Sequence, residues 1–424
     1  MGAFSSPGSE TLRVWLADLQ RAAELRSQHH LQRVLRPVQS AQGATVEIQG
    51  RSYVQFCTNN YLGLANDPEV IDAARAAISR YGTGAGASRL VAGSMDLHHQ
   101  LERALANFKQ TEAALIFPTG FMANLAVLTT LAGPLDRIVS DKLNHASLLD
   151  AARWSGADHR TFPHRNLTRA KTLLARPAAP AVGRSQPSVA PYHLVPPARG
   201  TRSFLVSDSV FSMDGDVADL AALSVVAESA GALLVVDEAH ATGVFGEHGR
   251  GIGELAGVEN HIAASVGTLS KALGSIGGFV CGSQALIDTL VNEARSFIYT
   301  TALPPACSAA ALTALTIIAR RPQLRRRVMA LAAYVREHLK TLDYDCGHSC
   351  SPIIPVICGS AESALEASEV LKQNGIFVPA IRPPTVAPGT ARLRLSLMAT
   401  HSDDQVELML KQMARLRDRI LVRT

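Results

Sequence analysis

The chain has 424 residues, enough for two or three domains at about 150 residues per domain. Hydrophobic residues make up 47% of the chain and charged residues 18%. That balance excludes a wholly disordered chain, because the apolar side chains can offset the entropy lost on folding. The formal net charge of +5 at pH 7 is spread along the chain rather than gathered in a tail. It therefore gives no reason to expect a nucleic-acid partner.

The cysteine content bears on the cellular compartment, and the uncharged stretches bear on whether the chain spans a membrane. Six cysteines in a chain of this length form no disulfide framework, which favours a reducing, cytoplasmic location. Cys346 and Cys350 do not have the spacing of a Cys-x-x-Cys zinc clip, so we expect no metal site. Two uncharged stretches, 113–135 and 296–319, are interrupted by proline. We expect buried helices there and no membrane span.

The first 60 residues read as a separate N-terminal segment. Apolar residues recur near helical spacing over 11–36 and Pro37 follows, which predicts an amphipathic helix. Over 45–57 the pattern alternates around the turn Gln-Gly-Arg-Ser. That alternation predicts a β-hairpin.

From residue 68 onward, helical patterns alternate with short apolar runs, and this order predicts an α/β fold. The runs are typical of buried parallel strands, at 114–117, 137–140, 204–207, 232–236, 262–266 and 278–281. We therefore expect a large domain over 61–300 with a mostly parallel, doubly wound sheet. Six prolines within 177–200 indicate an exposed, partly disordered insertion in it.

The remainder, 301–424, is predicted to be a smaller α+β domain. Two helical stretches follow Pro304 and Pro305, and the runs 351–358 and 391–397 read as strands. A final helix is expected from Asp403.

The run 231–236 ends in Asp237-Glu-Ala-His240, a carboxylate and an imidazole at the carboxyl end of a predicted strand. Ligands bind at that end of open α/β sheets. The same four letters occur in DEAH-type nucleic-acid-dependent ATPases, which also need a phosphate loop of the form G-x-x-x-x-G-K-[ST]. The dipeptide Gly-Lys is absent from the sequence, so we disfavour an ATPase.

Lys271 follows the next predicted strand, in Thr268-Leu-Ser-Lys271. A buried lysine shifts toward the neutral amine, the nucleophilic form that a Schiff base requires. The hydroxyl of Thr268 is a natural donor to a phosphate. With Asp237 to keep a pyridinium nitrogen protonated and His240 to reach a phenolic oxygen, these residues predict a pyridoxal 5'-phosphate (PLP) site.

Two further segments fit such a site. A strand-to-helix turn at 118–124 contains Gly120, and its free N–H groups and helix dipole would suit the phosphate. His145 follows another short strand, from which its ring could stack on the pyridine.

These residues resemble the α-oxoamine synthases, a family of fold-type I PLP enzymes. The likeness runs from about Leu16 to His401, without the proline-rich insertion. The motifs that carry it are Asn-Asn-Tyr-Leu-Gly-Leu at 59–64, Gly-Ala-Gly-Ala-Ser-Arg-Leu-Val-Ala-Gly at 84–93, His-Ala-Ser at 145–147, Phe-Ser-Met-Asp-Gly at 211–215, Asp-Glu-Ala-His at 237–240, Thr-Leu-Ser-Lys at 268–271 and Ile-Arg-Pro-Pro-Thr at 381–385.

The resemblance implies a role for each matched residue. Lys271 would bind the cofactor, Asp237 its ring nitrogen, Ser212 and His240 its phenolic oxygen, and His145 would stack on the ring. The implied phosphate contacts are Gly120, Phe121 and Thr268, with Thr300 or Thr301 reaching in from the other subunit of a homodimer. The implied substrate contacts are Arg26, Asn59, Thr385 and Arg394.

The implied reaction is a decarboxylative condensation of L-alanine with a pimeloyl thioester on coenzyme A or acyl carrier protein. Its product, 8-amino-7-oxononanoate, leads to biotin. The main alternative is a 2-amino-3-oxobutyrate coenzyme A ligase, which uses glycine and an acetyl group, and a serine palmitoyltransferase-like activity comes third. The pair Asn59-Asn60 is more similar to the ligase, whereas the runs 84–93 and 381–385 are more similar to the synthase that uses alanine.

Overall fold

The N-terminal segment contains a helix followed by a β-hairpin. The computed structural model describes residues 9–176 and 201–420, so the predicted insertion at 177–200 lies outside the described residues. Helix α1 (Glu10–Gln28) is capped by the Ser9 hydroxyl. It ends well before the predicted residue 36, because His30 adopts a left-handed conformation (φ 56°). The predicted hairpin is confirmed as β1 (Thr45–Ile48) and β2 (Arg51–Gln55).

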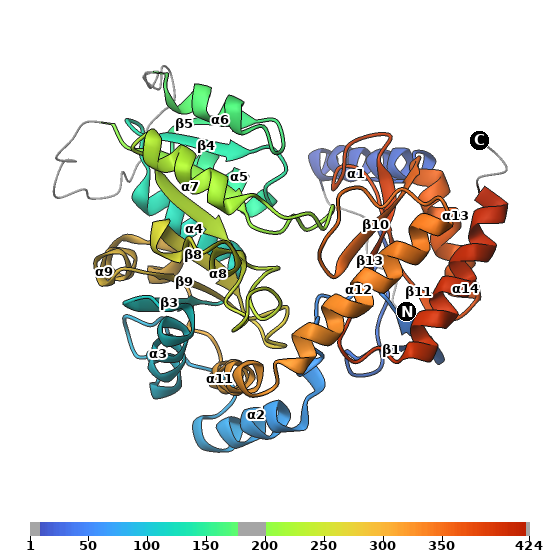
Figure 1. Cartoon of the computed structure of the whole chain (residues 1–424), viewed down its shortest axis with the longest axis horizontal. Coiled ribbons are helices and arrows are strands. Elements are labelled where there is room, and N and C mark those ends of the chain that lie inside the picture. The colour runs from blue at the N-terminus through green and yellow to red at the C-terminus, as the bar shows by residue number, and fades with distance from the viewer. Residues whose placement is uncertain (1–8, 177–200, 421–424) are drawn as a thin grey trace.

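A seven-stranded sheet forms the core of the larger lobe (Figure 1), in the order β3-β9-β8-β7-β6-β4-β5. Strand β9 alone runs antiparallel to its neighbours. All six predicted strands are present, and the mostly parallel α/β architecture is confirmed. The strands are β3 (Ala113–Phe117), β4 (Arg137–Asp141), β5 (Asp158–Phe162), β6 (Ser203–Asp208), β7 (Leu233–Asp237), β8 (Ile262–Thr268) and β9 (Gly278–Gly282).

Strand β5 was not predicted, because it is a partly exposed edge strand with the polar sequence Asp-His-Arg-Thr-Phe. Neighbouring residues along the strands point to opposite faces of the sheet, as Phe204 and Leu205 do, and so join two different hydrophobic clusters. One cluster lies under α4 (Gly120–Leu131), α5 (Ala146–Trp154), α9 (Gln284–Glu293) and α10 (Arg295–Ile298). The other lies under α3 (Asp96–Lys109), α6 (Leu167–Leu174), α7 (Leu220–Ser229) and α8 (Ile252–Ala256). The sheet is thus covered on both faces.

The smaller lobe contains two three-stranded sheets (Figure 1). One is β10-β13-β12, and the other joins the N-terminal hairpin to β11 in the order β1-β2-β11. The elements from 301 onward are α11 (Pro305–Arg320), α12 (Gln323–Thr341), β10 (Ile353–Gly359), α13 (Ala361–Gln373), β11 (Ile376–Phe377), β12 (Ala380–Ile381), β13 (Ala391–Ser396) and α14 (Asp403–Ile420).

Helices α11 and α12 connect the two lobes. Helix α11 packs against α3 and against α2 (Pro68–Tyr81) of the larger lobe, and α12 then crosses to the smaller one. Short 3-10 turns occupy Leu64–Asn66 and Glu259–His261. Among the described residues, no helix is both long and apolar enough to cross a membrane.

Candidate active site

The carboxyl ends of three neighbouring parallel strands bring predicted residues together. Strand β7 ends at Asp237 and β8 at Thr268, while β6 ends at Asp208, which pairs directly with Asp237 across the sheet. The turns that follow carry His240 and Lys271. This edge of the sheet is where open α/β folds bind ligands.

Asp237 is held by two donors. Its side chain is 6% exposed and accepts hydrogen bonds from the Ala239 backbone N–H (2.8 Å) and from Asn124 Nδ2 (2.7 Å). Asn124 also donates to Ser147 Oγ (2.9 Å). These two hydrogen bonds hold the carboxylate in position.

His145 caps α5 as a neutral ring. Its Nδ1 accepts from the Ser147 backbone N–H (3.3 Å) and lies 2.7 Å from Ser147 Oγ. Burial lowers the pKa of His145, with a smaller opposing effect from Asp237. Because Nδ1 is an acceptor, the single ring proton sits on Nε2.

Asp208 is a buried acid that the sequence interpretation left unassigned. It accepts a hydrogen bond from the His145 backbone N–H (2.6 Å). Burial, and next the charge of Asp237, raise the pKa of Asp208 well above its ordinary value. The signal in the sequence was an aspartate ending the strand next to β7.

Lys271 and His240 are both driven toward their neutral forms. Burial lowers the pKa of Lys271 to about 8, against the opposing pull of Asp237 and Asp208. Burial also lowers the pKa of His240 well below its ordinary value, aided by Lys271 and Arg394.

Tyr61 fixes the orientation of the His240 ring. The Tyr61 hydroxyl lies 2.6 Å from His240 Nδ1 and 3.3 Å from Asn59 Oδ1. Burial raises the pKa of Tyr61, so its proton stays in place. We assign that proton to the shorter contact, which leaves His240 Nε2 as an N–H donor.

Arg394 joins the two lobes at the site. It lies on β13 and donates to the Ser212 carbonyl, to Ser396 Oγ (2.8 Å) and to Asn59 Oδ1 (3.2 Å). The side chain is buried, and among the described residues no carboxylate pairs with it. A buried guanidinium with only neutral partners is suited to an anionic ligand.

A narrow cradle lies between α4 and β8. Thr119 caps α4 by accepting from the Met122 N–H (3.2 Å), and the amides of Gly120 and Phe121 come before the first intrahelical bond. A Cβ on Gly278 would lie 2.5 Å from Gly120 Cα, and one on Gly120 would lie 3.5 Å from Thr268 Oγ1. Gly278 must therefore lack a side chain for β9 to come this close to α4, whereas a Cβ on Gly120 would make an ordinary van der Waals contact with Thr268.

Other predicted residues lie outside this cluster. Arg26 is exposed in the last turn of α1. Thr385 accepts a hydrogen bond from Arg33 (3.0 Å) at the surface of the smaller lobe. Thr300 and Thr301 follow α10 and are at least partly exposed. The Phe121 ring points toward Trp154, with 6.3 Å between ring centroids.

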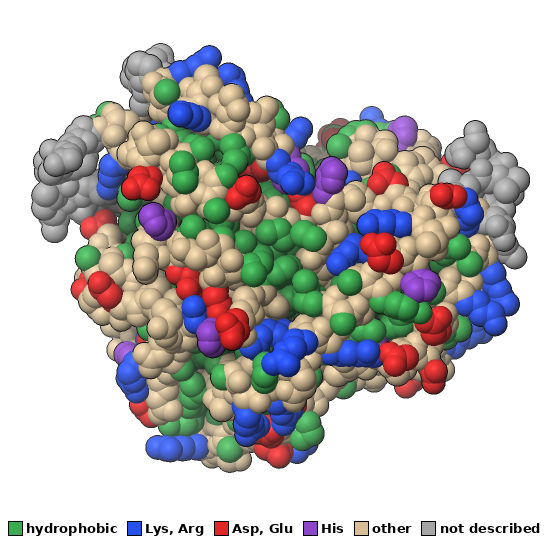
Figure 2. All heavy atoms as spheres, in the orientation of Figure 1, with side chains coloured by type: hydrophobic (Ala, Val, Ile, Leu, Met, Phe, Trp, Pro, Cys, Tyr) green, Lys and Arg blue, Asp and Glu red, His purple; other side chains and the backbone are tan. Residues whose placement is uncertain are grey.

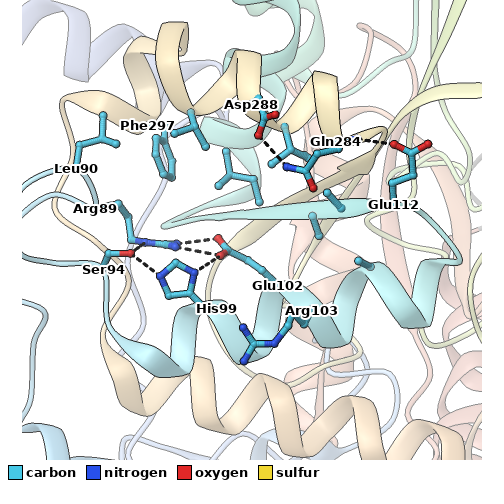
Figure 3. A pocket seen from close by; sticks show the side chains of 16 residues that line it. Arg89, Leu90, Ser94, His99, Glu102, Arg103, Glu112, Gln284, Asp288 and Phe297 are labelled. Atoms are coloured by element: carbon cyan, nitrogen blue, oxygen red, sulfur yellow. Dashed lines mark hydrogen bonds and ion pairs between the residues drawn. The ribbon is translucent and has the colours of Figure 1, made fainter.

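A separate hollow of about 430 Å³ lies between α3 and α9 (Figure 3). Arg89 spans it and forms a double hydrogen bond with Glu102, at 2.8 Å and 3.0 Å, while Ser94 contacts His99. The buried Arg89–Glu102 pair anchors the glycine-containing loop at 84–93 to α3. The described chain shows no group of side chains arranged to hold a metal ion.

Comparison with known proteins agrees with this architecture. Residues 51–413 match the family model for class I and II aminotransferases. An 8-amino-7-oxononanoate synthase from Geobacter sulfurreducens is 44% identical over 396 residues, covering 93% of this chain and 96% of the relative.

Two solved structures are also similar. A serine palmitoyltransferase variant from S. paucimobilis, solved with a bound adduct of PLP and myriocin, has a TM-score of 0.86 at 29% identity, covering 96% of this chain and 99% of the other. An 8-amino-7-oxononanoate synthase from Francisella tularensis has a TM-score of 0.71 at 29% identity, covering 87% and 98%. The chain therefore belongs to the class I and II aminotransferase family and, within it, to the α-oxoamine synthases, with the fold-type I architecture.

Proposed function

We propose that this protein is a PLP-dependent acyltransferase that condenses L-alanine with a pimeloyl thioester, with loss of CO₂, to give 8-amino-7-oxononanoate for biotin synthesis. The observation that carries the proposal is the convergence of Asp237, His240, Lys271 and His145 at one edge of the sheet. The 44% identity to a synthase of that name supports the choice of reaction.

The residues of the site fit the cofactor. Gly278 lets β9 approach the first turn of α4, where a Cβ would lie 2.5 Å from Gly120 Cα, and the first-turn amides of α4 suit a phosphate. Asn124 presents Nδ2 to Asp237 while its own Oδ1 is buried with no partner in the described chain. Lys271 would hold PLP covalently, Asp237 would face its ring nitrogen and His145 its ring face.

When bound, PLP supplies an electron-poor ring that takes up the electron pair released at the substrate Cα. The chain's own groups would handle protons and charge. Lys271, with its pKa lowered to about 8, can accept the Cα proton as a neutral amine. His240 would donate a hydrogen bond from Nε2 to the phenolic oxygen of the cofactor, and Arg394 would place its positive charge beside the substrate carboxylate.

Two further features belong to the proposal. We propose a cytoplasmic enzyme, supported by six free cysteines. We also propose a homodimer with the site at the subunit interface. Val91 and Tyr299 support it, because these large apolar side chains are 80% and 71% exposed beside the loops that carry Arg89 and Thr300. A monomer in light scattering that is fully active would contradict the dimer.

A direct assay tests the function. The purified protein with PLP, L-alanine and pimeloyl-coenzyme A should release coenzyme A and CO₂ and form the amino ketone, detected by mass spectrometry. Lys271→Ala should lose both the yellow absorption band and turnover. Asp237→Asn keeps the shape but removes the charge, so it should bind PLP yet turn over far more slowly. Absence of the amino ketone with the pimeloyl thioester on either coenzyme A or acyl carrier protein would contradict the proposal.

A further inference from the structure

Two basic segments far apart in the sequence are joined at the surface of the smaller lobe. Residues 25–46 and 370–402 contain no aspartate or glutamate. Arg382, in the second segment, donates to the carbonyls of His30 and Gln32 in the first (3.2 Å for the latter). Arg33, in the first, donates to Thr385 in the second (3.0 Å).

Three guanidinium groups gather at this junction, which we call the arginine triad: Arg33, Arg36 and Arg382. Arg33 and Arg36 are exposed. Burial lowers the pKa of Arg382, and the nearby charges of Arg33 and Arg36 lower it further. The three positive charges are therefore close enough to repel one another.

No acid offsets this repulsion. None of the three arginines forms an ion pair with any described residue, and their hydrogen bonds go to neutral oxygens. The arginines at the junction of α11 and α12, where basic side chains also gather (Figure 2), behave differently. There Arg320, Arg321 and Arg327 pair with Glu69, Asp67 and Asp403. The triad is thus a site of uncompensated charge that favours an anion.

The triad lies next to the proposed active site. Arg382 directly follows β12, where Ile381 pairs with Arg392 of β13. Arg394, which reaches Ser212 and Asn59, stands two residues along the same strand. Two residues of a strand span about 7 Å, so a ligand held by the triad can extend into the site from its rim.

The charge distribution around the triad favours a small polyanion. Helix α1, which precedes it, carries Glu10, Asp18 and Glu24, and Arg21 there pairs with Asp18 (3.5 Å). Helix α13, before the second segment, carries Glu362, Glu366 and Glu369. Each of these helices carries at least as many acidic as basic side chains, so the excess positive charge lies at the triad, whereas an acidic protein partner would require a broad basic face.

We propose that the arginine triad binds the phosphate groups of coenzyme A, and so selects a coenzyme A thioester as acyl donor. Guanidinium groups present paired N–H donors that match phosphate oxygens. This inference rests on the proposed function, since it concerns the acyl donor of that reaction. It assigns a role to Arg36, which forms no hydrogen bond or ion pair with the described residues.

The first experiment compares two donors that differ only in the nucleotide. Pimeloyl-coenzyme A and pimeloyl-pantetheine share the thioester, but the second lacks the nucleotide phosphates. With the PLP-loaded wild type, kcat/KM should favour the coenzyme A thioester, and added salt should weaken that preference. Arg36→Glu should reduce the preference about tenfold. The matched control Arg169→Glu, at an exposed position on α6, should keep the wild-type preference.

The second experiment measures binding without turnover. Free coenzyme A titrated into the wild-type holoenzyme by calorimetry should bind about tenfold more tightly than into Arg36→Glu. This titration involves no amino ketone product, so it remains informative if the proposed reaction fails. Equal affinity of the two proteins for coenzyme A, or a wild type that uses both thioesters equally, would overturn the inference. So would an Arg36→Glu variant that is impaired only with pimeloyl-acyl carrier protein.

Discussion

Asn124 Nδ2 donates to Asp237 Oδ2 at 2.7 Å, and both groups are buried. The same amide group donates to Ser147 Oγ at 2.9 Å, and Ser147 lies 2.7 Å from His145 Nδ1. One side chain on α4 therefore orients both the carboxylate and the imidazole of the proposed site. The sequence did not assign Asn124 this role.

Asn124→Leu keeps the approximate shape of the side chain but removes both donors. A hydrogen bond to a charged group contributes about 1.5–3 kcal/mol, so we expect kcat to fall between tenfold and a hundredfold and PLP to bind more weakly. Steady-state kinetics and PLP titration measure the two effects. Wild-type kinetics in Asn124→Leu would show that Asp237 is oriented by other groups.

Asn124→Asp tests the same contact by charge. A second carboxylate beside Asp237 disfavours the ionised pair, and one of the two acids takes up a proton. The variant should therefore lose activity relative to Asn124→Leu at neutral pH and recover part of it as the pH falls. A parallel pH profile for the two variants would contradict this expectation.

The glycine cradle gives a steric prediction. In Gly278→Ala the new Cβ would lie 2.5 Å from Gly120 Cα and from the Thr119 carbonyl oxygen, and backbone on both sides cannot yield easily. Overpacking of this kind costs about 1–3 kcal/mol. We expect a lower melting temperature and a larger loss of PLP affinity. The control Gly84→Ala meets no atom within 4 Å and has no left-handed φ, so it should leave both unchanged.

The sequence predicted those parts of the molecule that depend on local pattern. Buried strands read as apolar runs, and Asp237 and Lys271 were found because each follows such a run. Contacts between distant segments left no local signal. Tyr61 reaches His240, and Arg394 reaches Asn59 across 335 residues, and neither partner could be paired from spacing alone. The end of α1 was missed because one left-handed residue, His30, interrupts a pattern that remains amphipathic.

His164 gives a pH prediction outside the site itself. Its ring lies between Asp141 Oδ2 (3.0 Å) and Asp216 Oδ2 (2.8 Å), in the loops that lead to His145 and follow Ser212. These two carboxylates raise the pKa of His164 to about 9, against the effect of burial. Arg165 also faces Asp216, at 3.9 Å.

Because the folded pKa of His164 is raised, its stabilising effect is complete below the unfolded value near 6.5 and is lost as the pH rises through about 9. His164→Gln removes the cation between the two buried carboxylates and leaves only Arg165, 3.9 Å from Asp216. We expect it to lower the free energy of unfolding by about 3 kcal/mol at pH 6, with a smaller difference from wild type at pH 10. Urea unfolding at both pH values measures this. His261→Gln, at an exposed position, serves as the control, and a difference from wild type that is the same at both pH values would contradict the prediction.

The preferred amino acid and acyl thioester would distinguish the proposed synthase activity from the ligase and serine palmitoyltransferase activities. Asn59 Oδ1 accepts a hydrogen bond from Arg394 and lies 3.3 Å from the Tyr61 hydroxyl, so the first residue of the Asn59-Asn60 pair serves the proposed carboxylate site. A buried methyl group contributes about 0.8 kcal/mol, so alanine should exceed glycine only about fourfold in kcat/KM. A serine hydroxyl buried without a partner costs about 1–3 kcal/mol, and serine should be rejected more firmly. The test compares the three amino acids with pimeloyl, acetyl and palmitoyl thioesters of coenzyme A. If glycine with the acetyl thioester, or serine with the palmitoyl thioester, were the best pair, the preference for alanine would be wrong while the PLP chemistry at Lys271 would stand.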